Sequence, residues 1–188
     1  MNEHLSPVFG SVLPALTLVG IPYWVYGGIA IAGINGAYIR ENPDVDVFVM
    51  DEDFDKAIES VQRLEKKLGW KHKDATLQRG RRKRVWYALD TGREIFSIVP
   101  VFGSGGLVRF VFGRDFVPRT VLTSVSRRIG NYVFITPSTE FLKELVLRKA
   151  ESSRLLIQRR KKLKIDARVV MDDDEYRRLC ERLDEADI

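Results

Sequence analysis

The pattern of hydrophobic and polar positions predicts alternating helices and strands along most of the chain. Apolar residues recur every three or four positions over 4–20 and 52–68, the spacing that gathers them on one face of a helix, and a stretch rich in Ala, Gly and Ile predicts a further helix over 29–38. Short runs rich in Val, Ile, Phe and Tyr predict strands at 23–26, 44–50, 84–89, 94–101, 107–112 and 131–135. These elements predict an α/β fold in which a small mixed β-sheet is flanked by helices.

The pattern changes after residue 136, where strands give way to helices. Pro137, with a Ser or Thr cap, predicts the start of a helix whose buried face carries Phe141, Leu142, Leu145 and Val146. A basic stretch follows at 154–164, and an acidic first turn opens a last helix over 172–186. We therefore expect an α/β domain over 1–136 and a helical C-terminal segment over 137–188 packed on it.

Composition places the chain among ordinary soluble proteins. Its 188 residues are 45% hydrophobic and 30% charged, which is enough apolar material for a core in one or two domains. The net charge of +5 is compatible with a polyanionic partner. One cysteine excludes an intrachain disulfide and favours a reducing compartment. The apolar stretch 11–26 is broken by prolines and lacks the basic start of a signal peptide, so we expect a cytoplasmic protein with no membrane partner.

Candidate chemistry is concentrated in the stretch 23–50. Asp44 and Asp46 alternate along a predicted strand, so both point to one face, about 7 Å apart. Their mutual repulsion would be relieved by a divalent cation, and Mg²⁺ (or Mn²⁺) prefers such oxygen ligands. Gly27 and Gly28 precede a predicted helix and suit a backbone that approaches a phosphate. The stretch indicates a site for Mg²⁺ and a nucleoside triphosphate; the alternative is a solvated acidic strand end beside a glycine turn.

The order of these residues resembles the nucleotidyltransferase superfamily of DNA polymerase beta. The closest variants are the lincosamide and aminoglycoside adenylyltransferases and the abortive-infection toxin nucleotidyltransferases, so a role like that of a toxin–antitoxin pair is among the implications. The resemblance rests on Gly27, Gly28, Ala30, Arg40, Asp44 and Asp46. It implies transfer of a nucleoside monophosphate from a triphosphate such as ATP to a hydroxyl of a small molecule or tRNA.

The same resemblance assigns roles to individual residues. Asp44 and Asp46 would be catalytic and would hold the Mg²⁺, while Gly27 and Gly28 would hold the phosphates. Arg40 or Lys149 would meet phosphate charge. Lys149 and Asp166 match a lysine and aspartate pair in the helical segment of the family, and a substrate-lining role stands beside a purely structural basic helix face.

The family also has a third catalytic carboxylate, on a neighbouring strand, in a hydrophobic segment that ends in proline. In 95–100 the matching position is Ser97, and we expect it at the third catalytic position. Glu94, three residues away, would fall on the opposite face of a regular strand, and Asp90 lies in a turn. Either Glu94 or Asp90 supplies the ligand through a bulge or another register, or the chain is a catalytically impaired module that binds nucleotide or RNA.

A basic run, Gln78 to Arg84, precedes the hairpin. Such a run can grip nucleic acid or a substrate phosphate, or it can be a solvated loop.

Overall fold

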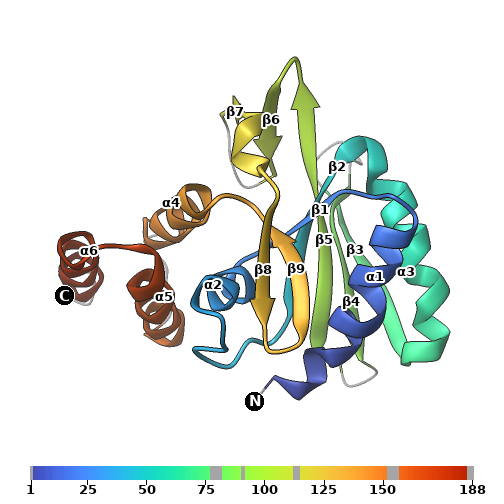
Figure 1. Cartoon of the computed structure of the whole chain (residues 1–188), viewed down its shortest axis with the longest axis horizontal. Coiled ribbons are helices and arrows are strands. Elements are labelled where there is room, and N and C mark those ends of the chain that lie inside the picture. The colour runs from blue at the N-terminus through green and yellow to red at the C-terminus, as the bar shows by residue number, and fades with distance from the viewer. Residues whose placement is uncertain (1, 77–81, 90–91, 112–114, 152–156, 186–188) are drawn as a thin grey trace.

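The computed structural model describes residues 2–76, 82–89, 92–111, 115–151 and 157–185 (Figure 1). The first half contains a 3₁₀ turn (Glu3–Leu5), a π-helical turn (Val8–Val12), α1 (Leu13–Leu18), β1 (Tyr23–Tyr26), α2 (Gly28–Asn35), β2 (Val45–Met50), a 3₁₀ turn (Asp51–Asp53), α3 (Phe54–Leu68), β3 (Trp70–Thr76) and β4 (Arg82–Leu89). The second half contains β5 (Glu94–Ser104), β6 (Leu107–Phe110), β7 (Val117–Pro118), a 3₁₀ turn (Arg119–Leu122), β8 (Val125–Ile129), β9 (Tyr132–Thr136), α4 (Thr139–Ala150), α5 (Ile157–Val170) and α6 (Asp173–Glu185).

The main sheet is mixed, as the sequence predicts. Its central strands follow the order β1-β2-β5-β4-β3, and β6 and β7 extend it from the far end of β5. The pair β2 and β5 is parallel, whereas β1 with β2, β4 with β5, and β3 with β4 are antiparallel. A separate small sheet is formed by β8 and β9.

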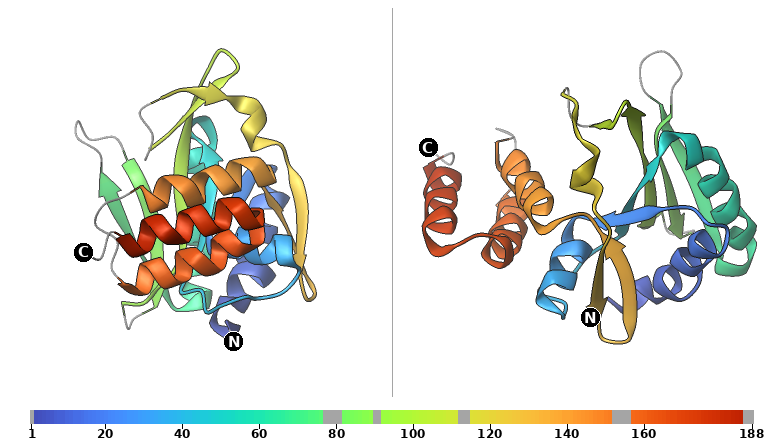
Figure 2. Two further views of the ribbon diagram at one scale, coloured as in Figure 1. Left: turned by 90° about the vertical axis from the view of Figure 1, so that its left-hand side faces the viewer. Right: turned by 45° about the horizontal axis from the view of Figure 1, so that its top comes forward.

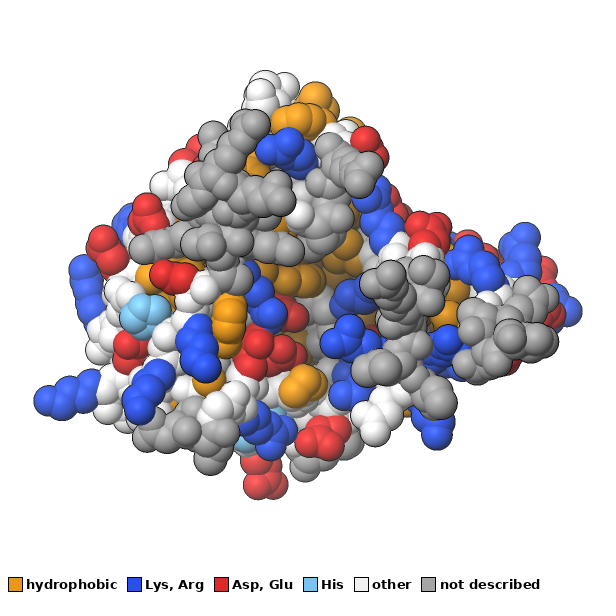
Figure 3. All heavy atoms as spheres, turned by 180° about the vertical axis from the view of Figure 1, so that it is seen from behind, with side chains coloured by type: hydrophobic (Ala, Val, Ile, Leu, Met, Phe, Trp, Pro, Cys, Tyr) orange, Lys and Arg blue, Asp and Glu red, His pale blue; other side chains and the backbone are white. Residues whose placement is uncertain are grey.

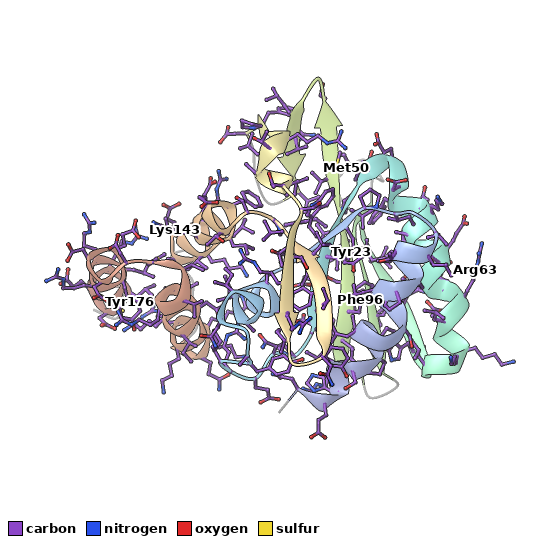
Figure 4. The ribbon with its side chains drawn as sticks, viewed as in Figure 1. Tyr23, Met50, Arg63, Phe96, Lys143 and Tyr176 are labelled. Atoms are coloured by element: carbon purple, nitrogen blue, oxygen red, sulfur yellow. The ribbon has the colours of Figure 1, made fainter. Side chains whose placement is uncertain are left out.

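The two faces of the sheet are covered by different helices. In β2, Val45, Val47 and Val49 join an apolar cluster with residues of α1 and α3, while Phe48 and Met50 join a second cluster with residues of α4 and α5. Figure 1 shows α1 and α3 on one side of the strands and α2, α4 and α5 on the other. Figure 4 labels Tyr23 and Phe96 of the first cluster and Met50 of the second. Asp46, two residues before Phe48, therefore belongs to the face of α2, α4 and α5.

Helices α4 and α5 lie on that second face, and α6 packs on their outer side (Figures 1 and 2). Ser138 caps α4 by accepting a hydrogen bond from the Phe141 amide at 3.2 Å. Leu163 and Ala167 of α5 share the apolar cluster that contains Phe48 of the sheet. The helical segment thus packs on the sheet, while its division from 1–136 as a separate domain stays a prediction. None of the described helices is both long enough and apolar enough to cross a membrane.

Some boundaries differ from the expected ones for local reasons. The helix predicted over 29–38 ends at Asn35, because Gly36 adopts a left-handed conformation with φ of 78° and stops it. Strands β3 and β8 were missed by the hydrophobic pattern because their sequences, WKHKDAT and VSRRI, are largely polar.

Candidate functional site

Three carboxylates from two neighbouring parallel strands meet at one end of the sheet. Asp44 directly precedes β2, Asp46 lies within it, and Glu94 opens β5. One carboxylate oxygen from each residue lies within 4.8 Å of the other two, and all three side chains are half-buried. We call Asp44, Asp46 and Glu94 the acidic triad. The two aspartates share a face as the alternation along the strand predicts.

The position of Glu94 corrects the expectation that it faces the opposite side. Along β4 and β5, Tyr87 pairs with Phe96 but the next residue, Ala88, pairs with Glu94. Ile95 is therefore an extra residue in β5, a β-bulge, and both Ile95 and Phe96 enter the apolar cluster beneath α3. The extra residue turns Glu94 back to the face of Asp46, so the bulge that sequence analysis left open supplies the third carboxylate.

Ser97 lies directly opposite Asp46 in the parallel pair of β2 and β5. It is fully buried, and its hydroxyl donates a hydrogen bond to Asp46 Oδ1. The structure therefore places Ser97 beside the triad, where its hydroxyl orients one aspartate.

Arg84 of β4 reaches into the acidic triad. Its Nη2 lies 3.1 Å from Asp46 Oδ1 and 3.9 Å from Asp44 Oδ2, and it also donates to Glu94 Oε1. Sequence analysis placed Arg84 in a basic run and at the start of a predicted strand, but its contact depends on β4 pairing with β5. Alternation along that strand puts Arg84 on the same face as Trp86, while the pairing of Trp86 with Ser97, which brings this face to the triad, is seen only in the structure. Residues 78–81 of the run lie outside the described part of the chain.

Negative charge dominates the electrostatics of the triad. Burial, together with the nearby negative charges of Asp46 and Glu94, raises the pKa of Asp44 to about 7. Burial likewise raises the pKa of Glu94, although Arg84 opposes this. Burial and the charge of Asp46 also raise the pKa of Tyr26 well above its usual value. One arginine does not balance three carboxylates, and an all-oxygen donor set of this charge suits a hard divalent cation such as Mg²⁺ or Mn²⁺.

Gly27 and Lys149 lie beside the triad. Gly27 immediately precedes α2 with φ of 72° and ψ of −151°, a conformation suited to glycine. A Cβ placed on it would lie 3.6 Å from Asp46 Oδ2. Gly27, Lys149 and Asp166 line one small cavity, so two of the predicted nucleotide-binding residues are brought together.

Arg40 is held by two neighbouring side chains, Asp166 and Asn42. Its Nε and Nη2 donate to the two carboxylate oxygens of Asp166 at 2.8 and 2.7 Å, and its Nη1 donates to Asn42 Oδ1 at 2.7 Å. Gly28 gives this guanidinium its space, because a Cβ there would meet Arg40 Nη2 and Asn42 Oδ1 at 2.2 Å. The structure thus brings Arg40 to Asp166, and a phosphate contact for Arg40 stays a prediction.

The surface on the side opposite to that of Figure 1 is hollowed near its middle (Figure 3). Acidic side chains gather in this hollow, and Lys and Arg side chains lie along its margin toward the C-terminal helices. Acidic side chains therefore lie at the bottom of the hollow, next to basic side chains at its margin.

Comparison with solved structures gives the fold. The sequence itself matches no protein-family model and no curated protein. The solution structure of the antibiotic-resistance factor ANT(2'')-Ia aligns with a TM-score of 0.64 and 14% identity over 99% of this chain and 90% of that chain. The lincosamide antibiotic adenylyltransferase LnuA, bound to lincomycin, aligns with a TM-score of 0.62 and 16% identity over 91% of this chain and 99% of that one. The chain has the nucleotidyltransferase fold.

The resemblance stated from sequence is thereby confirmed at the level of the fold. A nucleotidyltransferase-like protein from Paracoccidioides brasiliensis also aligns, with a TM-score of 0.56 and 14% identity over 98% of this chain and 88% of that chain. Within the nucleotidyltransferase fold, the chain gathers Asp44, Asp46, Ser97, Gly27 and Lys149 around one end of the sheet and adds Glu94 and Arg84 to them.

Proposed function

We propose that this protein transfers a nucleoside monophosphate from a nucleoside triphosphate to a hydroxyl group, with a divalent cation held by Asp44, Asp46 and Glu94. The observation that carries the proposal is the acidic triad, whose oxygens lie within 4.8 Å of one another on the two parallel strands of a nucleotidyltransferase fold. The triad offers the three carboxylates that the reaction requires. This favours an enzyme over a binding module that has lost a metal ligand.

The donor set of the triad fits the cation. Among the described residues, Arg84 is the one positive side chain in contact with the three carboxylates, which leaves them an excess of negative charge. Burial, together with the charges of Asp46 and Glu94, raises the pKa of Asp44. When bound there, a divalent cation supplies charge neutralisation for the triphosphate and for the attacking hydroxyl.

The remaining residues bind the phosphates and orient the carboxylate of Asp46. Gly27 lets the chain turn into α2, whose first amide groups can meet phosphate oxygens next to Asp46. Lys149, across the small cavity from Gly27, places a positive charge for the phosphates. Ser97 fixes the carboxylate of Asp46 through its hydroxyl hydrogen. Such prepositioned charges act mainly by orienting and stabilising the reacting groups.

The transfer takes place as a single displacement at the α-phosphorus. The acceptor oxygen forms a bond to the α-phosphorus, and the bond from the α-phosphorus to the bridging oxygen breaks. Pyrophosphate leaves with that electron pair, and the proton of the hydroxyl passes to solvent. We propose a small polyhydroxylated molecule as the acceptor, because LnuA is described with lincomycin and ANT(2'')-Ia with adenylyl-2''-tobramycin, and both share this fold. A tRNA hydroxyl is the second acceptor to test.

The test measures pyrophosphate released from each of the four nucleoside triphosphates with Mg²⁺ or Mn²⁺. Aminoglycosides, lincosamides and bulk tRNA serve as acceptors. We expect release that depends on the cation and on one acceptor class, and a loss of about 100-fold or more in Asp46→Asn. Glu59→Gln, which changes an exposed acid on α3 beneath the other sheet face, is the matched control and should retain activity.

Two results would contradict the proposal. Nucleotide binding measured by calorimetry without any pyrophosphate release would favour the binding module. Equal binding of Mg·ATP by wild type and by Asp46→Asn would remove the triad from the nucleotide site.

A further inference from the structure

One nitrogen of Arg84 occupies the centre of the acidic triad. Nη2 approaches Asp44, Asp46 and Glu94, while Nε of the same guanidinium is buried without a hydrogen-bond partner among the described residues. Arginine usually binds a carboxylate through two parallel hydrogen bonds, as Arg40 does with Asp166. Arg84 instead acts as a point charge shared by three carboxylates.

This position coincides with that of a triad-bound cation. A cation that contacts all three carboxylates must lie between them, and Nη2 already lies 3.1 Å from Asp46 Oδ1, 3.9 Å from Asp44 Oδ2 and in contact with Glu94 Oε1. The two positive groups therefore exclude each other. Arg84 has room to leave, because its side chain is 32% exposed. In its present position the guanidinium carbon already lies 5.9 Å from the centre of the Trp86 ring, so a short movement keeps this contact. An aromatic face is a favourable resting place for a guanidinium.

We propose that Arg84 is a displaceable internal cation: it holds the acidic triad together in the metal-free protein and gives up its place when a divalent ion arrives with the nucleotide. The proposal rests on the proposed function in one respect, that the nucleotide is a nucleoside triphosphate. The arriving triphosphate gives the displaced guanidinium a new anionic partner, which free Mg²⁺ does not. The triad consequently binds a divalent ion weakly by itself and more tightly together with a nucleoside triphosphate.

The test measures Mn²⁺ binding by calorimetry in the absence of nucleotide, with the melting temperature of the metal-free protein beside it. In Arg84→Gln we expect Mn²⁺ affinity to rise roughly fivefold or more, because competing ligands lower each other's affinity by the same factor. The metal-free melting temperature should fall, and Mn²⁺ should raise it by more than in wild type. Arg177→Gln, on exposed α6, removes the same charge elsewhere and should change neither value. Arg84→Lys, which keeps one positive nitrogen, should remain close to wild type.

Unchanged or weaker Mn²⁺ binding by Arg84→Gln would overturn the proposal, and so would an equal gain in Arg84→Lys. A second measurement uses the wild-type protein and does not depend on how the variants fold. The NMR signal of the Arg84 Nε–H group, assigned by its loss in Arg84→Lys, should shift as Mg²⁺ and a non-hydrolysable triphosphate are added together. A signal that stays fixed at saturation overturns the proposal. Failure of the transfer reaction is separate, because it would appear as absent pyrophosphate release while Arg84→Gln still gains Mn²⁺ affinity.

Discussion

Two arginines in this protein bind carboxylates in opposite ways. Arg40 faces one carboxylate, Asp166, through two hydrogen bonds of 2.8 and 2.7 Å, and both side chains are nearly buried, at 12% and 10% exposure. Arg84 faces three carboxylates through one nitrogen and leaves them with excess negative charge. The charges of Arg40 and Asp166 cancel, so their contact needs no further ion. The three carboxylates around Arg84 keep a net negative charge and can still bind a cation. Charge balance therefore separates a structural ion pair from a candidate binding site in the same fold.

The largest expected effect comes from breaking the balanced pair. Arg40→Met removes the guanidinium that pairs with the buried Asp166, and the free energy of unfolding should fall by about 3 kcal/mol. Urea unfolding followed by circular dichroism measures the change. The double variant Arg40→Met with Asp166→Leu should recover a large part of it. Arg148→Gln, from an exposed pair with Glu144, is the control and should cost less than about 1 kcal/mol. A cost in Arg40→Met no larger than in the control would contradict the structural role.

A second prediction tests how Arg40 obtains its space. Gly28→Ala places a methyl group against Arg40 Nη2 and Asn42 Oδ1, so the stability should fall by about 2 kcal/mol. In an Arg40→Met background the same substitution should cost clearly less, because a flexible side chain can move aside. A double-mutant cycle by urea unfolding gives this coupling. Additive costs would show that the glycine serves another purpose.

The unbalanced cluster predicts a pH dependence of stability without metal. The pKa of Asp44 is about 7 in the folded protein, above its ordinary value of 3.8. A raised pKa means that the folded state holds the proton more tightly. The stabilising contribution is therefore full below about pH 4 and is lost as the pH rises through 7, with a slope of at most about 1.4 kcal/mol per pH unit. Asp44→Asn should flatten this slope and leave the metal-free protein more stable at pH 8. An unchanged slope across pH 4 to 8 would refute the prediction.

The smallest expected effect concerns Ser97. Ser97→Ala removes the hydrogen bond to Asp46 and should lower the free energy of unfolding by about 1 kcal/mol. Nucleotidyl transfer should fall by less than in Asp46→Asn, because the alanine variant keeps all three carboxylates. Stability by thermal melting and pyrophosphate release are measured on one preparation. A loss of activity equal to that of Asp46→Asn would make Ser97 an essential member of the site.

Local rules were sufficient to predict part of this site. Alternation along one strand places Asp44 and Asp46 on the same face whatever the rest of the sheet does. The position of Glu94 could not be derived, because a one-residue bulge at Ile95 exists only in the pairing of β5 with β4. The contact of Arg84 depends on the same pairing. Arg40 and Asp166 are 126 positions apart, and their ion pair requires α5 to pack beside α2, which hydrophobic periodicity does not specify.

The fold, like the site, was predicted in part. Strands rich in valine, isoleucine and aromatic residues were predicted, and the mixed sheet flanked by helices is confirmed. The polar strand β3 was missed because its residues follow no apolar alternation. It lies at the edge of the sheet and pairs with β4, a pairing that its own polar sequence does not predict.

The side chain of Asn2 has a practical consequence for preparing the protein. Its Nδ2 donates to the Arg40 carbonyl at 3.1 Å, and its Oδ1 accepts from the Asn42 amide at 2.8 Å, so it clamps the loop that leads into Asp44. Asn2 is 5% exposed and has little space around it. A change at Asn2 that removes these two hydrogen bonds would loosen the loop, so a purification tag is better kept away from this residue. Such a tag is better placed at the far end of the chain, or cleaved before metal binding is measured.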